Sequence, residues 1–338
     1  MAPKPTHTPV LIVGAGLAGL AAARELQQAG CPFLVTEKSR GLGGRAATRR
    51  WVHGPVDHGA QFFTVRSPEF RAQVDDWLVR GICFEWTRGF HQWTREGLHE
   101  EPPDRHPRFA FHDGMSVLSR DLASGCDEQI LRNERLIRLA PDGDRWSGEF
   151  DSGRIVKADA VLLTAPAPQA ALLLGDAAPE AAASLASHAM SPCLALAARY
   201  PRQGLPWRGI QFAGHPVLSW VGHDTSKRPD SHRGSTILVL HANPEFSEAN
   251  YTAPPEEMTA GMLAALSEAT GTDFASPTET FFHRWRYSQP VAPGIPAPAT
   301  LSWSGAAPLL AAGDAVGGGR IEGAWLSGRA AGRKILNR

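Results

Sequence analysis

The spacing of apolar positions changes twice within the first 37 residues, which predicts a strand, a helix and a second strand. Residues 10–13 form an unbroken apolar run with β-branched side chains, which is typical of a strand buried on both faces of a parallel sheet. From Leu17 onward apolar residues recur at helical spacing until Gly30, a residue type that commonly ends helices. A second apolar run, residues 33–36, ends at Glu37. The pattern predicts a βαβ unit.

Three glycines lie between the first predicted strand and the helix, in the sequence Gly14-Ala-Gly16-Leu-Ala-Gly19. Gly14 permits a tight turn, Gly16 has no side chain to obstruct a pyrophosphate, and Gly19 lets the helix pack closely on the strand. The start of the helix would present free N–H groups and the positive end of its dipole to phosphates. Glu37 is placed to accept hydrogen bonds from the ribose hydroxyls of an adenosine. The segment therefore predicts a dinucleotide site.

The apolar pattern of the remaining chain predicts further strands and helices. An Asp-Gly pair at residues 142–143 separates two strand-like runs and indicates a hairpin. The Pro-rich stretch 102–107 is expected to be a loop between domains. Strands are expected at 84–86, 90–93, 136–139, 146–150, 159–164, 193–200, 209–212, 217–221, 236–241 and 309–314, and helices at 68–80, from 115, at 170–188, 255–270 and 323–336. These elements predict an α/β fold, in which a Rossmann-like domain built from discontinuous segments accompanies an α+β domain with a mixed sheet.

Charge and composition narrow the classes of function. The chain has 338 residues, with 34 Lys and Arg against 34 Asp and Glu. This balance argues against nucleic acid or an anionic membrane as the main partner, because such binding needs a basic face. The four cysteines are widely separated, so neither a disulfide framework nor a metal site is expected. No secretory signal is recognised, and prolines interrupt the apolar stretch 158–174, so a cytoplasmic protein is expected.

The residues after Glu37 distinguish a flavin from a nicotinamide cofactor. Residues 37–48 read E-K-x-x-x-x-G-G-R-x-x-T, with Gly43 and Gly44 followed by Arg45. After a dinucleotide turn, this segment resembles the flavoprotein amine oxidase superfamily. In that superfamily the glycine pair lets the backbone approach FAD and the arginine contacts its pyrophosphate, so the resemblance implies bound FAD. Residues 57–66 resemble the segment that passes near the isoalloxazine ring in these oxidases.

The C-terminal region carries a second set of features suited to a flavin. Residues 309–314 predict a buried strand that ends in Asp314, whose carboxylate can accept a hydrogen bond from a ribityl hydroxyl. After a glycine loop, a helix is expected to begin near Gly323 and Ala324 and to direct its N–H groups at the flavin N1/O2 edge. The expected cofactor-binding residues are Gly14, Ala15, Gly16, Ala18, Gly19, Glu37, Lys38, Gly43, Gly44, Arg45, Gln61, Phe62, Leu136, Gly313, Asp314, Arg320, Glu322, Gly323 and Ala324.

Three more segments, at residues 237–242, 282–290 and 319–328, resemble the renalase group of this superfamily, especially its bacterial members. The resemblance implies an oxidase that converts isomeric dihydronicotinamides, the 2- and 6-dihydro isomers of NAD(P)H, to NAD(P)+ and passes the electrons to O2, forming H2O2. No cysteine follows Cys193, so the flavin-tethering cysteine of some amine oxidases is missing and non-covalent FAD is expected. We expect an FAD-binding domain of residues 1–74, 112–165 and 299–338, and a substrate-binding domain of residues 75–111 and 166–298.

No residue is assigned a catalytic role, because hydride transfer to a flavin requires orientation of the donor more than an acid or a base. The residues expected to line the substrate cavity are Phe62, Thr64, Arg66, His241, Trp285, Tyr287 and Arg320. The aromatic residues and the histidine could equally be core residues, and the two arginines could form surface ion pairs. Two alternative functions stay open: a flavin amine oxidase or related flavin desaturase, and a flavin-binding protein without turnover.

Overall fold

The computed structural model describes residues 6–51, 54–100, 106–228, 234–291, 300–305 and 307–338. They form two compact units, each assembled from separate stretches of the chain. Unit 1 comprises Met1–Ala46, Leu118–Met190 and Gln289–Arg338, and unit 2 comprises Ala47–Val117 and Ser191–Ser288. The predicted Pro-rich loop at 102–107 lies largely outside the described residues.

Unit 1 is built on a parallel sheet with the strand order β9-β2-β1-β12-β19. The βαβ unit predicted from the N-terminal pattern is confirmed, since β1 pairs in parallel with β2 on one side and with β12 on the other. Antiparallel strands extend the sheet, because β18 pairs with β19 and the hairpin β10–β11 pairs with the first half of β12. The strands are β1 (Thr6–Val13), β2 (Leu34–Glu37), β9 (Ile130–Arg132), β10 (Leu136–Asp142), β11 (Arg145–Phe150), β12 (Ile155–Leu163), β18 (Leu301–Trp303) and β19 (Leu309–Ala311).

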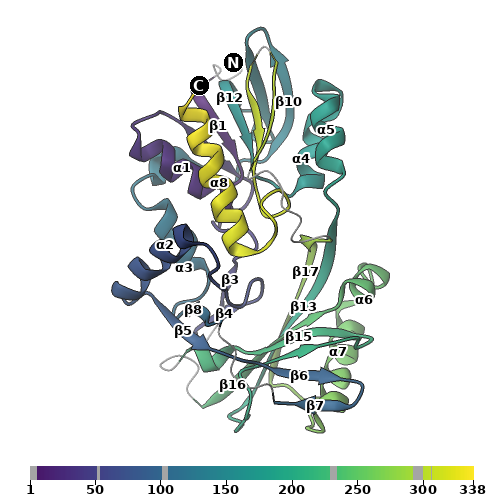
Figure 1. The fold of residues 1–338 in the computed structure, drawn as a ribbon. Helices are drawn as coiled ribbons and strands as arrows, with labels where there is room; N and C mark the ends of the chain where they lie inside the picture. The colour runs from purple at the N-terminus through teal and green to yellow at the C-terminus, as the bar shows by residue number, and fades with distance from the viewer. Residues whose placement is uncertain (1–5, 52–53, 101–105, 229–233, 292–299, 306) are drawn as a thin grey trace. The chain divides into compact units, whose positions relative to one another are not determined.

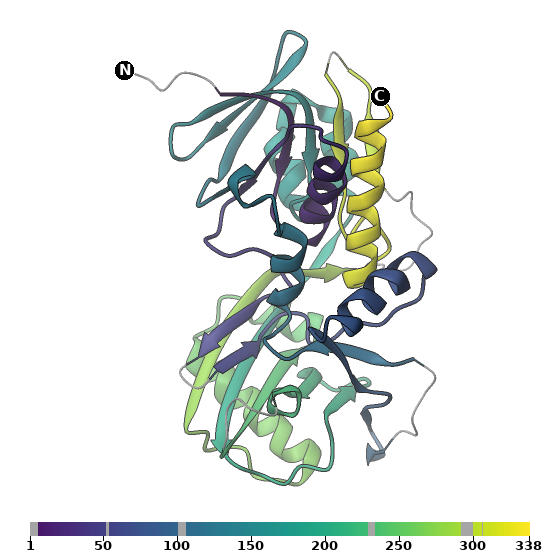
Figure 2. The ribbon, with the colours of Figure 1, turned by 90° about the vertical axis from the view of Figure 1, so that its left-hand side faces the viewer.

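Helices cover both faces of this sheet, which explains why the second half of β1, residues 10–13, is an unbroken apolar run. Leu11 and Val13 belong to a core shared with α4 (Ala167–Leu174) and α5 (Pro179–Ala186). Ile12 points to the other face and is also fully buried. On the side opposite α4 and α5, α1 (Leu17–Gln28) and α8 (Arg320–Leu336) lie side by side (Figures 1 and 2). They pack so closely that a Cβ added to Gly328 would lie 2.1 Å from the carbonyl oxygen of Ala18.

Unit 2 contains a mixed sheet, as predicted; it has seven strands in the order β17-β13-β16-β15-β14-β6-β7. The pairing of β14 with β6 is parallel, whereas β13, β16, β15 and β14 pair antiparallel in turn. One face of the sheet packs on α7 (Pro255–Thr270). The strands are β6 (His91–Thr94), β7 (Gly97–His99), β13 (Met190–Pro201), β14 (Gly209–Phe212), β15 (Leu218–His223), β16 (Ser235–Ala242) and β17 (Glu279–Pro290).

Smaller elements complete the chain. Two two-stranded sheets pair β3 (Thr48–Trp51) with β4 (Gly54–Asp57) and β5 (Cys83–Thr87) with β8 (Arg108–Phe111). The remaining helices are α2 (Pro68–Val79), α3 (Ser116–Ala123) and α6 (Pro244–Ala249), with 3-10 turns at Asp127–Gln129, Gly175–Ala177 and Asp224–Lys227. The predicted helix 170–188 is in fact two helices, because Gly175 adopts a positive φ of 44° and Pro179 starts a new helix.

The boundaries of the compact units differ from the predicted domain boundaries. Residues 47–74 and 112–117 belong to unit 2 rather than to the unit that holds the Rossmann-like sheet, because Val56 packs against Ala197 and Val239 of the unit 2 sheet. Residues 166–190 belong to unit 1, because α4 and α5 pack on its sheet.

Candidate functional site

The turn between β1 and α1 has the geometry of a pyrophosphate cradle. Gly14 has a φ of 109°, and its N–H donates to the Thr36 carbonyl at 2.8 Å. A Cβ on Gly19 would lie only 2.0 Å from the Gly14 carbonyl oxygen, so this helix–turn contact requires glycine. A Cβ on Gly16 would meet no atom within 4 Å, and no side chain caps the start of α1. The N–H groups of the first helical turn are therefore available to an anion.

Glu37 is buried at the end of β2 and holds the same turn. Its carboxylate accepts the backbone N–H of Ala15 at 2.9 Å and that of Ser39 at 2.8 Å. Since a carboxylate offers about four acceptor positions, these two bonds leave capacity for ribose hydroxyls. The residue thus has a structural task that the sequence pattern did not reveal.

The glycine pair lies against this cradle. The N–H of Gly43 donates to the Ala15 carbonyl at 2.8 Å, and Gly43 forms an isolated parallel bridge with Gly16. Gly44 has a φ of 55°, and a Cβ there would lie 3.7 Å from the Gly16 Cα. The backbone of the loop therefore approaches the first turn of α1 closely, so that both segments border the same cradle.

Arg45, the next residue, forms a bidentate ion pair with Asp314 of the segment after β19. The Nη1–Oδ2 distance is 2.7 Å and the Nη2–Oδ1 distance is 2.6 Å. Both residues were expected to bind the cofactor separately, Arg45 at the pyrophosphate and Asp314 at the ribityl chain. The structure brings them together, although they are far apart in sequence, at one edge of the unit 1 sheet.

The start of α8 is a second uncapped helix terminus. Gly318, Gly319 and Arg320 have φ values of 84°, 85° and 66°, so the two residues before α8 and its first residue all have positive φ. For Arg320 this costs on the order of 1–3 kcal/mol, a strain that is usually found at functional sites. No side chain caps α8, whose first turn contains Glu322 and Gly323. Its N–H groups are suited to a site of developing negative charge.

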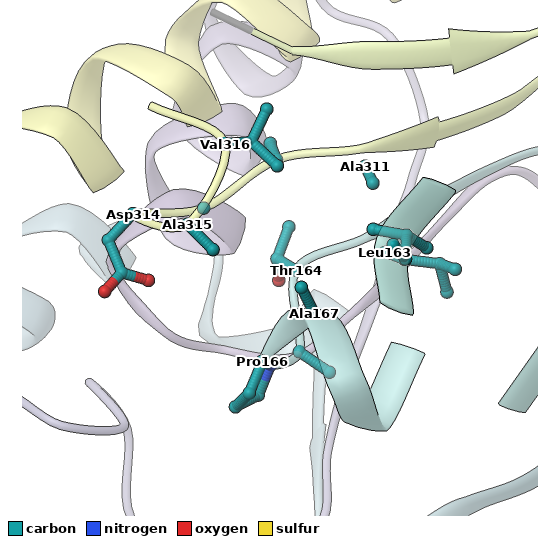
Figure 3. A pocket seen from close by; sticks show the side chains of 12 residues that line it. Leu163, Thr164, Pro166, Ala167, Ala311, Asp314, Ala315 and Val316 are labelled. Atoms are coloured by element: carbon teal, nitrogen blue, oxygen red, sulfur yellow. The ribbon is translucent and has the colours of Figure 1, made fainter. Parts of the chain in front are cut away.

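A small pocket lies at the carboxyl ends of β12 and β19, the edge at which open α/β sheets bind ligands. Figure 3 shows Asp314, Ala315 and Val316 on one side of it and Thr164, Pro166 and Ala167 on the other. The predicted adenine contact Leu136 is a buried core residue opposite Phe150 in the β10–β11 hairpin, and the exposed Lys38 hydrogen-bonds Gln169. The glycine cradle, the acid at the end of β2 and the two uncapped helix termini fit an extended FAD.

Of the residues expected to bind substrate, all but Arg320 belong to unit 2. Phe62 is half-buried among aromatic rings, with centroid distances of 4.9 Å to Phe90 and 5.5 Å to Trp220. Trp220 lies opposite His241 in the β15–β16 pairing. Thr64 and Tyr287 are half-buried, whereas Arg66 and Arg320 are exposed.

A second aromatic layer in unit 2 contains Trp285 and His58. The two rings stack with a centroid distance of 5.3 Å, and the Trp285 Nε1–H donates to the His58 carbonyl at 3.0 Å. Burial, with a contribution from His283, lowers the pKa of His58 from 6.5 to about 4. Burial likewise lowers the pKa of His241 to about 4. Both imidazoles are therefore neutral at pH 7.

Sequence reasoning missed His58 and Trp220. His58 lies inside the segment that resembles oxidases, but a single histidine carries no periodic signal. Trp220 lies in a correctly predicted strand, and only the pairing of β15 with β16 brings it beside His241. Trp220 Nε1 and His241 Nε2 are both buried, and neither has a hydrogen-bond partner among the residues that the structure describes.

Comparisons with known proteins agree with these features. Residues 83–336 match the family of flavin-containing amine oxidoreductases, and residues 12–77 match the NAD(P)-binding Rossmann-like domain. Mouse renalase is 26% identical over 298 residues, which cover 83% of this chain and 84% of renalase. The resemblance to the amine oxidase superfamily and its renalase group is confirmed, and the protein is a flavin-dependent oxidoreductase.

Solved structures show the same fold at low sequence identity. Cyclohexylamine oxidase from Brevibacterium oxydans IH-35A is 15% identical with a TM-score of 0.74, over 98% of this chain and 100% of that chain. Wild-type putrescine oxidase bound to putrescine is 15% identical with a TM-score of 0.72, over 99% and 100% of the two chains. The predicted α/β fold class is confirmed. Among the described helices, none has the length and apolar character needed to cross a bilayer.

Proposed function

The chain belongs to the flavin-containing amine oxidoreductase family, and from this premise we propose that it is an oxidase with non-covalently bound FAD that acts on isomeric dihydronicotinamide dinucleotides. The observation that carries the proposal is the similarity to renalase, which extends over 83% of the chain rather than over the dinucleotide turn alone. The reaction converts the 2- or 6-dihydro isomer of NAD(P)H, together with O2 and a proton, to NAD(P)+ and H2O2.

Unit 1 is proposed to hold the cofactor. Glu37 would bind the adenosine ribose, the first turn of α1 and the Gly43–Gly44 backbone would bind the pyrophosphate, and the start of α8 would stabilise negative charge on the flavin. Bound FAD supplies the two-electron oxidation and the delivery of electrons to O2. The protein chain binds FAD and the substrate, orients them for hydride transfer and shields them from water.

Non-covalent attachment is supported by the cysteines. Cys31, Cys83, Cys126 and Cys193 all precede residue 194, whereas the uncapped helix α8 lies at residues 320–336. Burial raises the pKa of Cys83 and that of Cys193 to about 12, so both thiols stay protonated and unreactive at neutral pH.

Unit 2 is proposed to hold the substrate. Phe62, Trp220 and Trp285 offer aromatic surface, and His241 is held as a neutral imidazole by burial. Such surroundings suit a planar, uncharged dihydronicotinamide ring, because neither partner carries a charge that must be desolvated. An amine oxidase or a related flavin desaturase is the alternative, and the likeness of fold to cyclohexylamine oxidase is compatible with it.

Steady-state H2O2 production tests the substrate class. The purified protein should consume O2 and form H2O2 with the 6- or 2-dihydro isomer of NAD at micromolar concentrations. Ordinary 4-dihydro NADH serves as the control that presents the same adenosine, ribose and phosphates with the hydride at another ring carbon. Turnover of a primary or secondary amine, with none of either isomer, would replace the proposal with the amine oxidase alternative.

A further inference from the structure

Four charged side chains form a buried cluster in unit 2, and none of the four is among the residues proposed to bind the cofactor or the substrate. Asp57, Asp224, Lys227 and Arg228 all have side chains with 0% exposure. The Lys227 ammonium lies 2.9 Å from Asp57 Oδ2 and 2.7 Å from Asp224 Oδ1, and Arg228 Nη2 lies 2.6 Å from Asp57 Oδ2. Burial alone would raise the pKa of Asp57, but Lys227 and Arg228 hold it well below its usual range.

A buried charged cluster contributes less to stability than apolar side chains would in the same place. Removing each charge from water is unfavourable, and well-packed apolar residues of similar volume often give a core that is as stable or more stable. Three of the four residues lie together in and after the 3-10 turn Asp224–Lys227, and the fourth ends β4. The cluster therefore ties the end of β4 to the turn that follows β15, and its geometry specifies where the next residues go.

The cluster also makes a hydrogen bond to the segment directly after β4. Besides its two carboxylate partners, Lys227 Nζ donates to the Gln61 carbonyl oxygen at 3.1 Å. The Gln61 side-chain Nε2 donates to the Asp57 carbonyl and, at 3.2 Å, to that of Gly59. Gln61 is thus fixed by its backbone and by its amide, which leaves Oε1 in one orientation.

The Gln61 side-chain oxygen lies near Trp220, one of the aromatic residues proposed to bind substrate. Oε1 is buried and has no hydrogen-bond partner among the described residues, and the same holds for Trp220 Nε1. Both atoms lie 3.0 Å from the position that a Cβ on Gly222 would occupy, so they border the same small space on β15. Phe62, the next residue, packs on Trp220. The segment held by the cluster therefore adjoins the aromatic surface proposed to bind substrate.

We propose that Lys227 is a positioning residue for substrate binding, which acts by holding Gln61 and Phe62 against Trp220 from within the buried Asp57–Asp224–Lys227–Arg228 cluster. This inference rests on the proposed function insofar as unit 2 binds the substrate. Lys227 itself touches no substrate. Its effect is on affinity rather than on the chemical step, because it fixes the surface that receives the ligand.

The test separates positioning from stability with two variants. Lys227→Met removes the ammonium and leaves the Asp224 carboxylate buried without its closest cation, so it should be strongly destabilised. The double variant Asp224→Asn/Lys227→Met removes one charge of each sign and keeps the Asp57–Arg228 pair, so its melting temperature should recover toward that of the wild type. Arg199→Met, which breaks a partly exposed pair with Glu279 on the same sheet, is the control.

Each protein would be titrated with NAD+, the product of the proposed reaction, while the visible flavin spectrum reports binding. The double variant should retain its FAD and its melting temperature but bind NAD+ on the order of tenfold more weakly, because a small misplacement of binding groups is costly. Arg199→Met should bind NAD+ like the wild type. Unchanged NAD+ affinity in a folded double variant would show that the cluster is only structural, and loss of FAD would show that it serves the cofactor instead; either result overturns the proposal.

Hydrogen exchange keeps this test independent of the proposed function. If the wild type itself does not bind NAD+, the proposed function fails, and the peptide that covers residues 57–63 then decides the inference. Faster exchange in that peptide for the double variant, with unchanged exchange in β13 and β16, would support the positioning role. Equal protection in both proteins would refute it.

Discussion

Glu37→Gln is the substitution whose effect on the cofactor site can be worked out most directly. The Glu37 carboxylate accepts two backbone N–H groups, from Ala15 at 2.9 Å and from Ser39 at 2.8 Å, in a buried position. A glutamine offers one oxygen and one NH2, so one of the two N–H donors must face another donor. Hydrogen bonds to a charged group contribute about 1.5–3 kcal/mol each, and an unsatisfied buried donor costs about 1–3 kcal/mol.

The loss should appear in two quantities. The free energy of unfolding should fall by roughly 1–3 kcal/mol, because the turn that carries Ala15 loses a partner. The Kd for FAD should rise about 10- to 100-fold, because a ribose hydroxyl loses a charged acceptor and 1.4 kcal/mol corresponds to a factor of ten. Quenching of flavin fluorescence on titration of the cofactor-free protein with FAD measures the Kd, and thermal unfolding measures the stability.

Glu25→Gln is the matched control for Glu37→Gln. Glu25 is another largely buried glutamate of unit 1 that accepts from Arg329 and, at 3.0 Å, from Arg333, but it joins α1 to α8 at their far ends from the cradle. This variant should lose stability and keep the FAD affinity of the wild type. If Glu37→Gln lowers stability as Glu25→Gln does but leaves the Kd for FAD unchanged, Glu37 does not bind the adenosine ribose.

Three further predictions follow from the packing, the histidines and the cysteines. Gly328→Ala should lower the free energy of unfolding by about 1–3 kcal/mol, since its Cβ would lie 2.1 Å from the Ala18 carbonyl oxygen, whereas Gly261→Ala on the exposed face of α7 should raise it by roughly 0.5–1 kcal/mol; equal melting temperatures would contradict the packing. Stability should fall as the pH drops from 6.5 to 4, because histidines of the unfolded chain take up protons near pH 6.5 whereas folded His58 and His241 do so only near pH 4. His58→Phe should make the melting temperature depend less steeply on pH over this range. An unchanged dependence would mean that His58 is not held neutral in the folded protein. Acid denaturation followed by filtration should release all of the flavin as free FAD, and flavin retained with the protein would disprove non-covalent binding.

The N-terminal strand, helix and second strand were predictable because the apolar run and the glycine spacing both depend on residues that are close in sequence. The unbroken apolar run of β1 reflects burial on both faces, and the requirement for glycine at Gly14 and Gly19 comes from contacts within the same turn. The antiparallel hairpin around residues 142–143 was equally local. The expected helix at 323–336 begins instead at Arg320, because a left-handed backbone at a non-glycine residue has no sequence signal.

What the sequence could not supply depends on contacts between distant segments. Arg45 and Asp314 were each expected to contact FAD, but nothing in either segment indicates that they pair with each other. The buried cluster joins Asp57 to Lys227 and Arg228 across 170 residues of chain, in a region without periodic pattern. The packing of Val56 on the unit 2 sheet is another such contact, because the residues next to Val56 in the sequence give no sign of it.

Anaerobic titration of the flavin tests the central claim most directly. The purified, yellow protein is mixed without O2 with one equivalent of the 6-dihydro isomer of NAD, and the flavin absorbance is followed together with the amount of NAD+ formed. Bleaching within seconds, with one NAD+ formed per flavin reduced and full recovery of colour on admission of O2, is the result expected of a dihydronicotinamide oxidase. A flavin that stays oxidised with both the 6- and the 2-dihydro isomer, but is bleached by an amine, would contradict it.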